Sequence, residues 1–202
     1  MINYGATPVT TGSTTKKKDY MYKDFMVDLE SMGTESGDAI IAIGVVPMDI
    51  DARQLGDEFY IKISLESCQA AGLNINADTV MWWMQQDQAA RDQFKNNNTF
   101  PRIADALRQL SQFIDYQAGH YSVDEINIWG NGSIMDNALL KAAYKACNAP
   151  LPWTYKGDLC YRTLRSLTPN VTAIEPEIAH HALHDAKAQA LTLFKRFDAL
   201  GL

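Results

Sequence analysis

The sequence lacks any apolar run long enough to cross a membrane. Its longest nearly apolar stretch is AIIAIGVVPM, residues 39–48, whereas a membrane-spanning helix needs about 20 apolar residues. The first residues, MINYGATPVTTGSTTKKKDY, also lack the apolar core of a secretory signal peptide. These absences argue against a membrane-bound or secreted protein, and no membrane partner is expected.

Cysteine is scarce, with three residues at positions 68, 147 and 160. The number is odd, and the spacing matches no zinc-binding pattern. We therefore expect reduced thiols and a cytoplasmic location.

Basic residues are outnumbered, because 18 Lys and Arg stand against 24 Asp and Glu and give a net charge of −6. A domain that binds nucleic acid by simple electrostatic attraction is normally basic. The composition argues against that class. It leaves open an enzyme that holds metal ions, because such ions supply positive charge that a composition count omits.

What is present is enough for one ordinary domain: 202 residues, 47% of them hydrophobic and 21% charged. Residues 1–22 are rich in Thr, Ser and Gly and contain three consecutive lysines. We expect this segment to be a flexible arm, either solvated or touching phosphate, and residues 23–202 to form the folded domain.

The first half of the domain shows β-rich runs followed by helical segments. Three runs at residues 24–30, 39–50 and 57–64 have short links containing Gly or Asp, which favours antiparallel neighbours. Helices are expected at residues 65–72, 77–94 and 101–117, with Pro101 in the first turn of the last one.

The second half alternates strand and helix. The run INIWG at residues 126–130 precedes the loop GNGS and a helix at residues 134–147, a unit that adds a parallel strand. A second unit is expected from a strand at residues 155–158 and a helix at residues 159–167, before a final helix at residues 180–200. The predicted fold class is α/β, a mixed sheet of three antiparallel strands plus parallel strands, flanked by α-helices.

Four acids stand where this fold can bring them together. Asp28 and Glu30 are two residues apart and so share one face of the first strand, where they repel each other unless a cation lies between them. Asp136 and Asp185 fall near helix starts, where the helix dipole favours acids. Each acid has an ordinary explanation alone, but the combination predicts a site for divalent cations.

The ordered motifs DLESMGT, DTVMWWM, WGNGSIMD and HHALHD resemble the DEDDh 3′–5′ exonuclease family, which has the ribonuclease-H-like fold. The likeness is strongest to phage and prophage exonuclease VIII-like proteins and to related bacterial 3′–5′ exoribonucleases, and it covers residues 24–197. It implies an exonuclease domain, in a bacterial or phage-infected cell, that hydrolyses single-stranded DNA or RNA from the 3′ end and releases nucleoside 5′-monophosphates.

The resemblance also implies that Asp28, Glu30, Asp136 and Asp185 bind two Mg²⁺ or Mn²⁺ ions. Asp28 would bridge both ions, Glu30 and Asp185 would complete one site, and Asp136 would support the other. Oxygen ligands suit these metals, and two ions about 3.5–4 Å apart can stabilise the attacking water and the leaving oxygen. His180 is the implied general base, because a neutral imidazole can accept a proton from water at neutral pH.

Three histidines crowd the last motif. His180 has the family's spacing to Asp185. His181 is the alternative, because residues four apart share a helix face. His184 directly precedes the acid and is expected to point elsewhere.

The resemblance assigns the turn of Ser31, Met32 and Gly33 to contacts with the terminal nucleotide; an ordinary turn is the alternative. Trp82 and Trp83 diverge by about 100° on a helix. One of them should pack in the core while the other stacks on a base. We name Trp83 as the base contact.

Two other functions use the same residues: a ribonuclease-H-like module that binds nucleic acid without cutting, and a phosphohydrolase of nucleotides. Five clustered titratable groups argue against the module. The expected partners are 3′ ends of single-stranded DNA or RNA, and the choice stays open because phosphate chemistry is indifferent to the 2′-hydroxyl unless a contact reads it. A homo-oligomer is compatible with the sequence.

Overall fold

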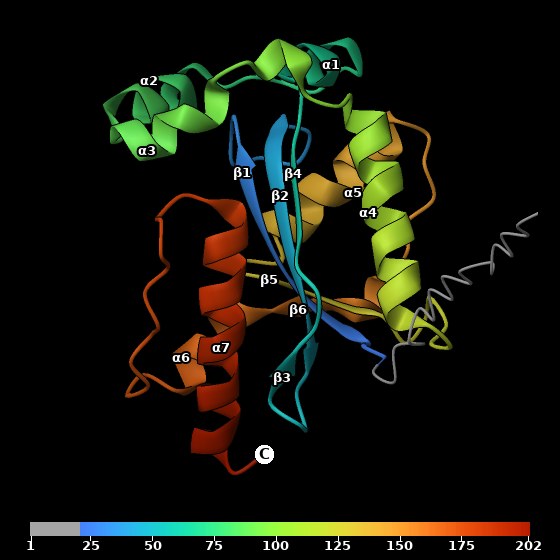
Figure 1. Cartoon of the computed structure of the whole chain (residues 1–202), viewed down its shortest axis with the longest axis vertical. Coiled ribbons are helices and arrows are strands. Elements are labelled where there is room, and N and C mark those ends of the chain that lie inside the picture. The colour runs from blue at the N-terminus through green and yellow to red at the C-terminus, as the bar shows by residue number, and fades with distance from the viewer. Residues whose placement is uncertain (1–20) are drawn as a thin grey trace, which may run out of the picture.

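The computed structural model describes residues 21–202. Within this range six strands form one mixed sheet in the order β3-β2-β1-β5-β6, and β4 also pairs with β2. β1 is antiparallel to β2 and parallel to β5 (Figure 1), which confirms the predicted fold class. The short strand β3 was not predicted. The strands are β1 Asp24–Ser31, β2 Ile40–Asp49, β3 Gln54–Leu55, β4 Phe59–Lys62, β5 Asn127–Gly130 and β6 Asp158–Cys160.

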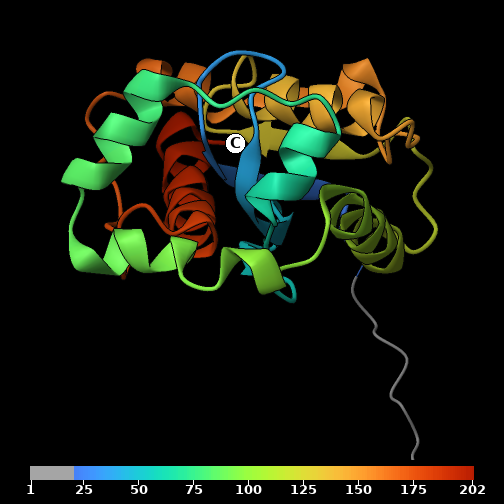
Figure 2. The same cartoon turned by 90° about the horizontal axis from the view of Figure 1, so that it is seen from above.

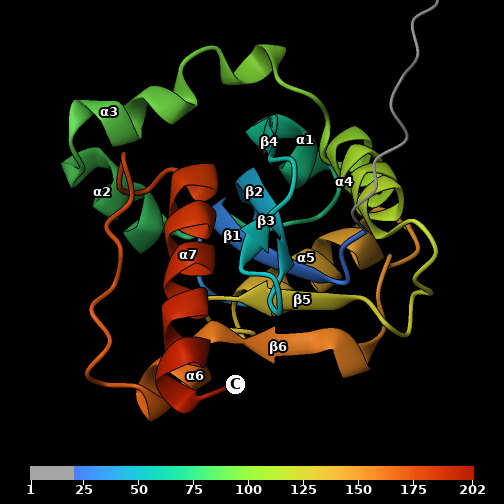
Figure 3. The same ribbon diagram turned by 60° about the horizontal axis from the view of Figure 1, so that its bottom comes forward.

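Helices cover both faces of the sheet and one of its ends. α6 and α7 lie on one face, and α4 and α5 lie on the other (Figures 1 and 3). α1, α2 and α3 form a cap over one end of the sheet, as Figures 1 and 2 show. The α-helices are α1 Leu65–Ala70, α2 Ala77–Gln85, α3 Gln88–Arg91, α4 Ile103–Ala118, α5 Asp136–Ala146, α6 Tyr161–Leu167 and α7 Ala182–Leu200. Short 3-10 helices span Asp92–Phe94, Asn97–Thr99 and Tyr155–Gly157.

Side chains alternate along β1 between two apolar cores. Phe25, Val27 and Leu29 belong to the larger core, which includes residues of α4 and α5. Met26 belongs to the smaller core beneath α6 and α7. Asp28 and Glu30 have the phase of Met26, so the strand that builds the core also delivers both carboxylates to the side of α7.

The start of α7 lies directly on the sheet because Gly44 of β2 has no side chain. Gly44 pairs with Asp28, and a Cβ added to it would lie 2.3 Å from the carbonyl carbon of Ala182. Even an alanine would force the two elements apart. This close approach brings Asp185, in the first turn of α7, to the strand position of Asp28.

The helix expected over residues 77–94 is interrupted, so this prediction was wrong in extent. Gln86 is extended and ends α2. Asp87 then starts α3, because its carboxylate accepts a hydrogen bond from the Ala90 N–H at 2.9 Å. The side chain of Asp87 competes with a continuous helix, as acids at helix starts do.

Other predicted bounds also shift. The strand expected at residues 155–158 begins at Asp158, whose carboxylate accepts hydrogen bonds from Trp153 and Asn137, and α6 follows it. Pro101 lies outside α4, because Arg102 is the N-cap residue. The last helix begins at Ala182 instead of residue 180.

The predicted boundary between the arm and the domain falls between residues 22 and 23, at the start of the described residues. Residues 1–20 of the predicted arm lie outside the described residues, but Tyr22 is buried and its N–H donates to the Gln117 carbonyl at 3.0 Å. The three cysteines are free. None of the helices in residues 21–202 combines the length and apolar character needed to span a membrane.

Candidate active site

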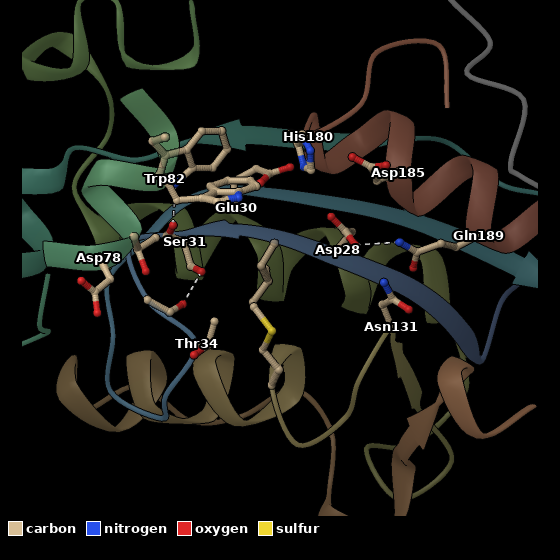
Figure 4. A pocket seen from close by; sticks show the side chains of 15 residues that line it. Asp28, Glu30, Ser31, Thr34, Asp78, Trp82, Asn131, His180, Asp185 and Gln189 are labelled. Carbon is tan, nitrogen blue, oxygen red and sulfur yellow. Dashed lines mark hydrogen bonds between the residues drawn. The ribbon is translucent and has the colours of Figure 1, made fainter. Parts of the chain in front are cut away.

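Three of the four predicted acids meet at one end of the sheet (Figure 4). Asp28, Glu30 and Asp185 each offer a carboxylate oxygen within 4.8 Å of the others. Two come from β1 and one from the first turn of α7. Residues separated by more than 150 positions thus form one cluster of oxygen donors.

Asp136 lies beside this cluster, at the first residue of α5. It is 4% exposed, and its Oδ2 accepts a hydrogen bond from the Gly132 N–H at 2.9 Å. Its negative charge is near enough to raise the pKa of Asp28. Asp136 therefore belongs to the site electrostatically, although its oxygens are outside the three-acid cluster.

Burial raises the pKa of all four carboxyl groups. The pKa of Glu30 rises to about 8, because burial is reinforced by the charges of Asp185 and Asp136. The pKa of Asp28 is raised well above its usual value by burial and by its three acidic neighbours. For Asp136 the backbone N–H of Gly132 offsets part of the effect of burial, and the pKa is about 6. A cation among these oxygens would favour their ionised forms.

His180 lines the same cleft as the acids and is exposed (Figure 4). Its backbone is left-handed, with φ of 58°, a conformation that is uncommon outside glycine. Its carbonyl accepts a hydrogen bond from the side-chain amide of Gln93, and its ring lies edge-on to Trp82, with centroids 5.0 Å apart. The left-handed residue turns the chain into α7 and leaves the imidazole at the cleft.

The other two histidines of the motif pack together away from the cleft. The rings of His181 and His184 have centroids 4.3 Å apart, and His181 stacks on Tyr60 at 4.3 Å. The backbone N–H of His181 donates to Asp185 Oδ2 at 3.0 Å. His181 thus contacts the site through its backbone, and His180 is the one of the three whose ring lines it.

The cleft has a volume of about 630 Å³, within the range of small-molecule sites. Its lining brings together β1, the turn after it, the cap, the GNGS loop and α7. The lining residues are Asp28, Leu29, Glu30, Ser31, Gly33, Thr34, Asp78, Thr79, Trp82, Trp83, Asn131, Met135, His180, Asp185 and Gln189.

Two residues predicted to contact a nucleotide, Met32 and Trp83, are buried in the structure. Met32 is 4% exposed and packs in the larger core, and its N–H donates to the Ala39 carbonyl at 2.8 Å. Neither its side chain nor its N–H is available to a ligand. Ser31 and Gly33 do line the cleft, but the Ser31 hydroxyl already donates to the Gly33 carbonyl at 2.6 Å.

Trp83, predicted to stack on a base, is 3% exposed, and its indole N–H donates to the Ser31 carbonyl at 3.0 Å. This hydrogen bond links α2 to β1. Its neighbour Trp82 is 41% exposed and borders the cleft. The sequence correctly required one packed and one exposed ring. The packed ring is Trp83 and the exposed ring is Trp82, and both border the cleft.

Two glutamines that take part in the site, Gln189 and Gln93, were not predicted from the sequence. Gln189 Nε2 donates to Asp28 Oδ1 at 2.7 Å, and Gln93 holds the His180 carbonyl. Gln189 lies four residues after Asp185 and so shares its helix face, a signal that was available. Nothing local to Gln93 indicates its contact, which spans 87 residues.

Solved structures of exonuclease I share this fold. One structure of exonuclease I superposes with a TM-score of 0.61 at 15% identity, and an Escherichia coli exonuclease I complex with a dT13 oligonucleotide superposes at 0.63 and 14%. A zinc-bound complex of the E. coli enzyme with single-stranded DNA superposes at 0.60 and 12%. Each match covers 90% of this chain and 43% of the other, so the chain spans less than half the length of these proteins. The shared fold is ribonuclease-H-like.

No curated protein sequence matches this chain. One protein family does, over residues 23–195, and it is described as the 3′–5′ exoribonuclease Rv2179c-like domain. This range contains all four acids and His180. The chain therefore belongs to the family of 3′–5′ exoribonuclease Rv2179c-like domains.

Proposed function

We propose that the chain is a two-metal-ion 3′–5′ exonuclease that removes nucleoside 5′-monophosphates from single-stranded nucleic acid. The observation that carries the proposal is the meeting of Asp28, Glu30 and Asp185 within 4.8 Å in an open cleft, with Asp136 beside them. Membership of an exoribonuclease family supports the reaction and its direction.

The four acids fit divalent cations. Their donors are all carboxylate oxygens, which suit Mg²⁺ and Mn²⁺ better than zinc. Burial and mutual repulsion raise the pKa values of these acids. A bound cation would offset the repulsion and favour the ionised carboxylates. Asp28, Glu30 and Asp185 would hold one ion, and Asp28 with Asp136 the second. Two ions bound there supply electrostatic stabilisation of the attacking and leaving oxygens.

His180 accepts a proton from the attacking water in this proposal. The water oxygen bonds to phosphorus while the bond from phosphorus to the 3′-oxygen breaks. The last nucleotide leaves as a 5′-monophosphate, and the 3′-oxygen of the shortened strand takes up a proton from solvent and becomes a 3′-hydroxyl. Gln93 supports this role because it holds the carbonyl of the left-handed His180 from a different part of the fold.

A single strand suits the cleft better than a duplex. The exposed ring of Trp82 offers a stacking surface that only an unpaired base can use. The net charge of −6 provides no broad basic face for gripping a duplex. The similar exonuclease I structures include complexes with dT13 and dA16 oligonucleotides, whereas the family description names RNA. We propose action on both, in a cytoplasmic setting that the free thiols support.

The decisive experiment gives the protein 5′-labelled single strands of DNA and RNA with Mn²⁺ or Mg²⁺, with and without chelator. Stepwise shortening by one nucleotide is expected, and the chelator should stop it. Asp28→Ala should abolish cleavage in a protein that remains folded. Cutting of a closed single-stranded circle would show internal cleavage and refute the exonuclease. Binding without any cleavage would favour the non-catalytic module instead.

A further inference from the structure

Gln189 holds the central carboxylate of the acid cluster. It lies on α7, and its Nε2 donates to Asp28 Oδ1 at 2.7 Å (Figure 4). Among the residues that the structure describes, this is the hydrogen bond that the Asp28 side chain accepts. The other groups that act on the Asp28 carboxylate are the acids Asp136, Glu30 and Asp185, whose charges raise its pKa.

An uncharged amide is well suited to the position beside the Asp28 carboxylate. A lysine or arginine would neutralise Asp28 and compete with a cation for its oxygens, while an apolar residue would leave its orientation free. An amide donates to one carboxylate oxygen without adding charge, and the other oxygen stays available. The Asp28 carboxylate that binds a cation is ionised and only accepts hydrogen bonds. The amide N–H of Gln189 must therefore face Asp28, as it does in the structure, and Gln189 Oε1 then points away from it.

Gln189 Oε1 is buried and has no hydrogen-bond partner in the protein. A buried acceptor without a partner is costly, so this oxygen suits a donor that enters the cleft, such as water. The amide Nε2 thus hydrogen-bonds to Asp28, whereas Oε1 can still accept a hydrogen bond. Its position on the same helix as Asp185 also ties the two carboxylates to one rigid element.

We propose that Gln189 is a positioning residue, which orients the Asp28 carboxylate for cation binding without contacting the reacting atoms. The inference rests on the two-ion function proposed above. Residues that orient metal ligands typically contribute 10–100-fold to metal affinity or activity. Gln189→Met keeps the length of the side chain and removes the amide. It should therefore raise the Mn²⁺ concentration for half-maximal binding by about 10–100-fold.

The test measures Mn²⁺ binding by calorimetry, the metal-free melting temperature, and cleavage as a function of Mn²⁺ and of oligonucleotide. Gln189→Met should need more Mn²⁺, recover most of its kcat at saturating Mn²⁺, and keep the KM for oligonucleotide. A purely structural role in α7 would instead lower the metal-free melting temperature and leave the Mn²⁺ requirement unchanged. Gln112→Met, at an exposed position of α4, makes the same chemical change as a control.

The outcomes separate this inference from the proposed function. If the natural protein bound no Mn²⁺, the two-ion function would fail. If the natural protein bound Mn²⁺ and Gln189→Met bound it equally well, the positioning role alone would be overturned. Should Gln189→Met not fold, Gln189→Asn decides by the same comparison. Its amide is one methylene too short to keep the contact with Asp28, so it too should require more Mn²⁺.

Discussion

Replacing Glu30 by glutamine should stabilise the metal-free protein at alkaline pH. Glu30 is 6% exposed, and burial together with the charges of Asp185 and Asp136 raises its pKa from 4.5 to about 8. A raised pKa means that the protonated carboxyl favours the folded state. This contribution is complete below about pH 4.5 and is lost as the pH rises to about 8.

The magnitude follows from the size of that change. Each pKa unit corresponds to about 1.36 kcal/mol, so the ionised form of Glu30 costs up to on the order of 5 kcal/mol. The cleft is open to water, and the acids can share protons, so we expect Glu30→Gln to recover about 2 kcal/mol at pH 9. For a chain of this size that corresponds to a rise of about 4–8 °C in melting temperature.

Thermal unfolding followed by circular dichroism, with chelator present, at pH 5 and pH 9 measures this. The gain should be clear at pH 9 and small at pH 5, where folded Glu30 keeps its proton. Added Mn²⁺ should raise the melting temperature of the natural protein more than that of the variant. The exposed Glu66 provides the control Glu66→Gln, with little change at either pH. An equal effect of Glu30→Gln at both pH values would refute the reasoning.

Four other substitutions test separate parts of the site. His180→Ala should slow single-turnover cleavage by about 10²–10⁴-fold and leave calorimetric Mn²⁺ binding nearly unchanged. Trp82→Ala should weaken binding of a single strand, measured by anisotropy in chelator, by about 1–3 kcal/mol. Trp83→Ala should instead destabilise the fold by about 3–5 kcal/mol in urea unfolding. Gly44→Ala should displace the start of α7 and lower both the melting temperature and the Mn²⁺ affinity.

Matched variants make these results decisive. His181→Ala removes a ring that stacks on Tyr60 away from the cleft, so a larger catalytic loss there than at His180 would reverse the assignment of the base. Unchanged strand binding by Trp82→Ala would remove the stacking role. Wild-type Mn²⁺ binding by Gly44→Ala would show that the acid cluster does not depend on the close approach of α7.

The sequence alone determined the parts of this protein that rest on local periodicity and on short motifs. Alternation along residues 24–30 put Asp28 and Glu30 on one face because the strand period is two. The change from strand runs to strand–helix units predicted a mixed sheet. The sequence also located Asp136 and Asp185 near the starts of two helices, because acids are favoured there by the helix dipole and each helix follows a recognisable loop.

Tertiary structure decided the features that depend on residues far apart in the chain. Local spacing shows that Trp82 and Trp83 diverge, but only the packing of α2 on β1 buries Trp83. The same holds for Gln189, whose hydrogen bond to Asp28 joins positions 161 residues apart. Periodicity reports which way a side chain points from its own element. The residue that a side chain contacts depends on where a second element packs. For Gln189 and Asp28, the close contact of α7 with Gly44 brings the two residues together.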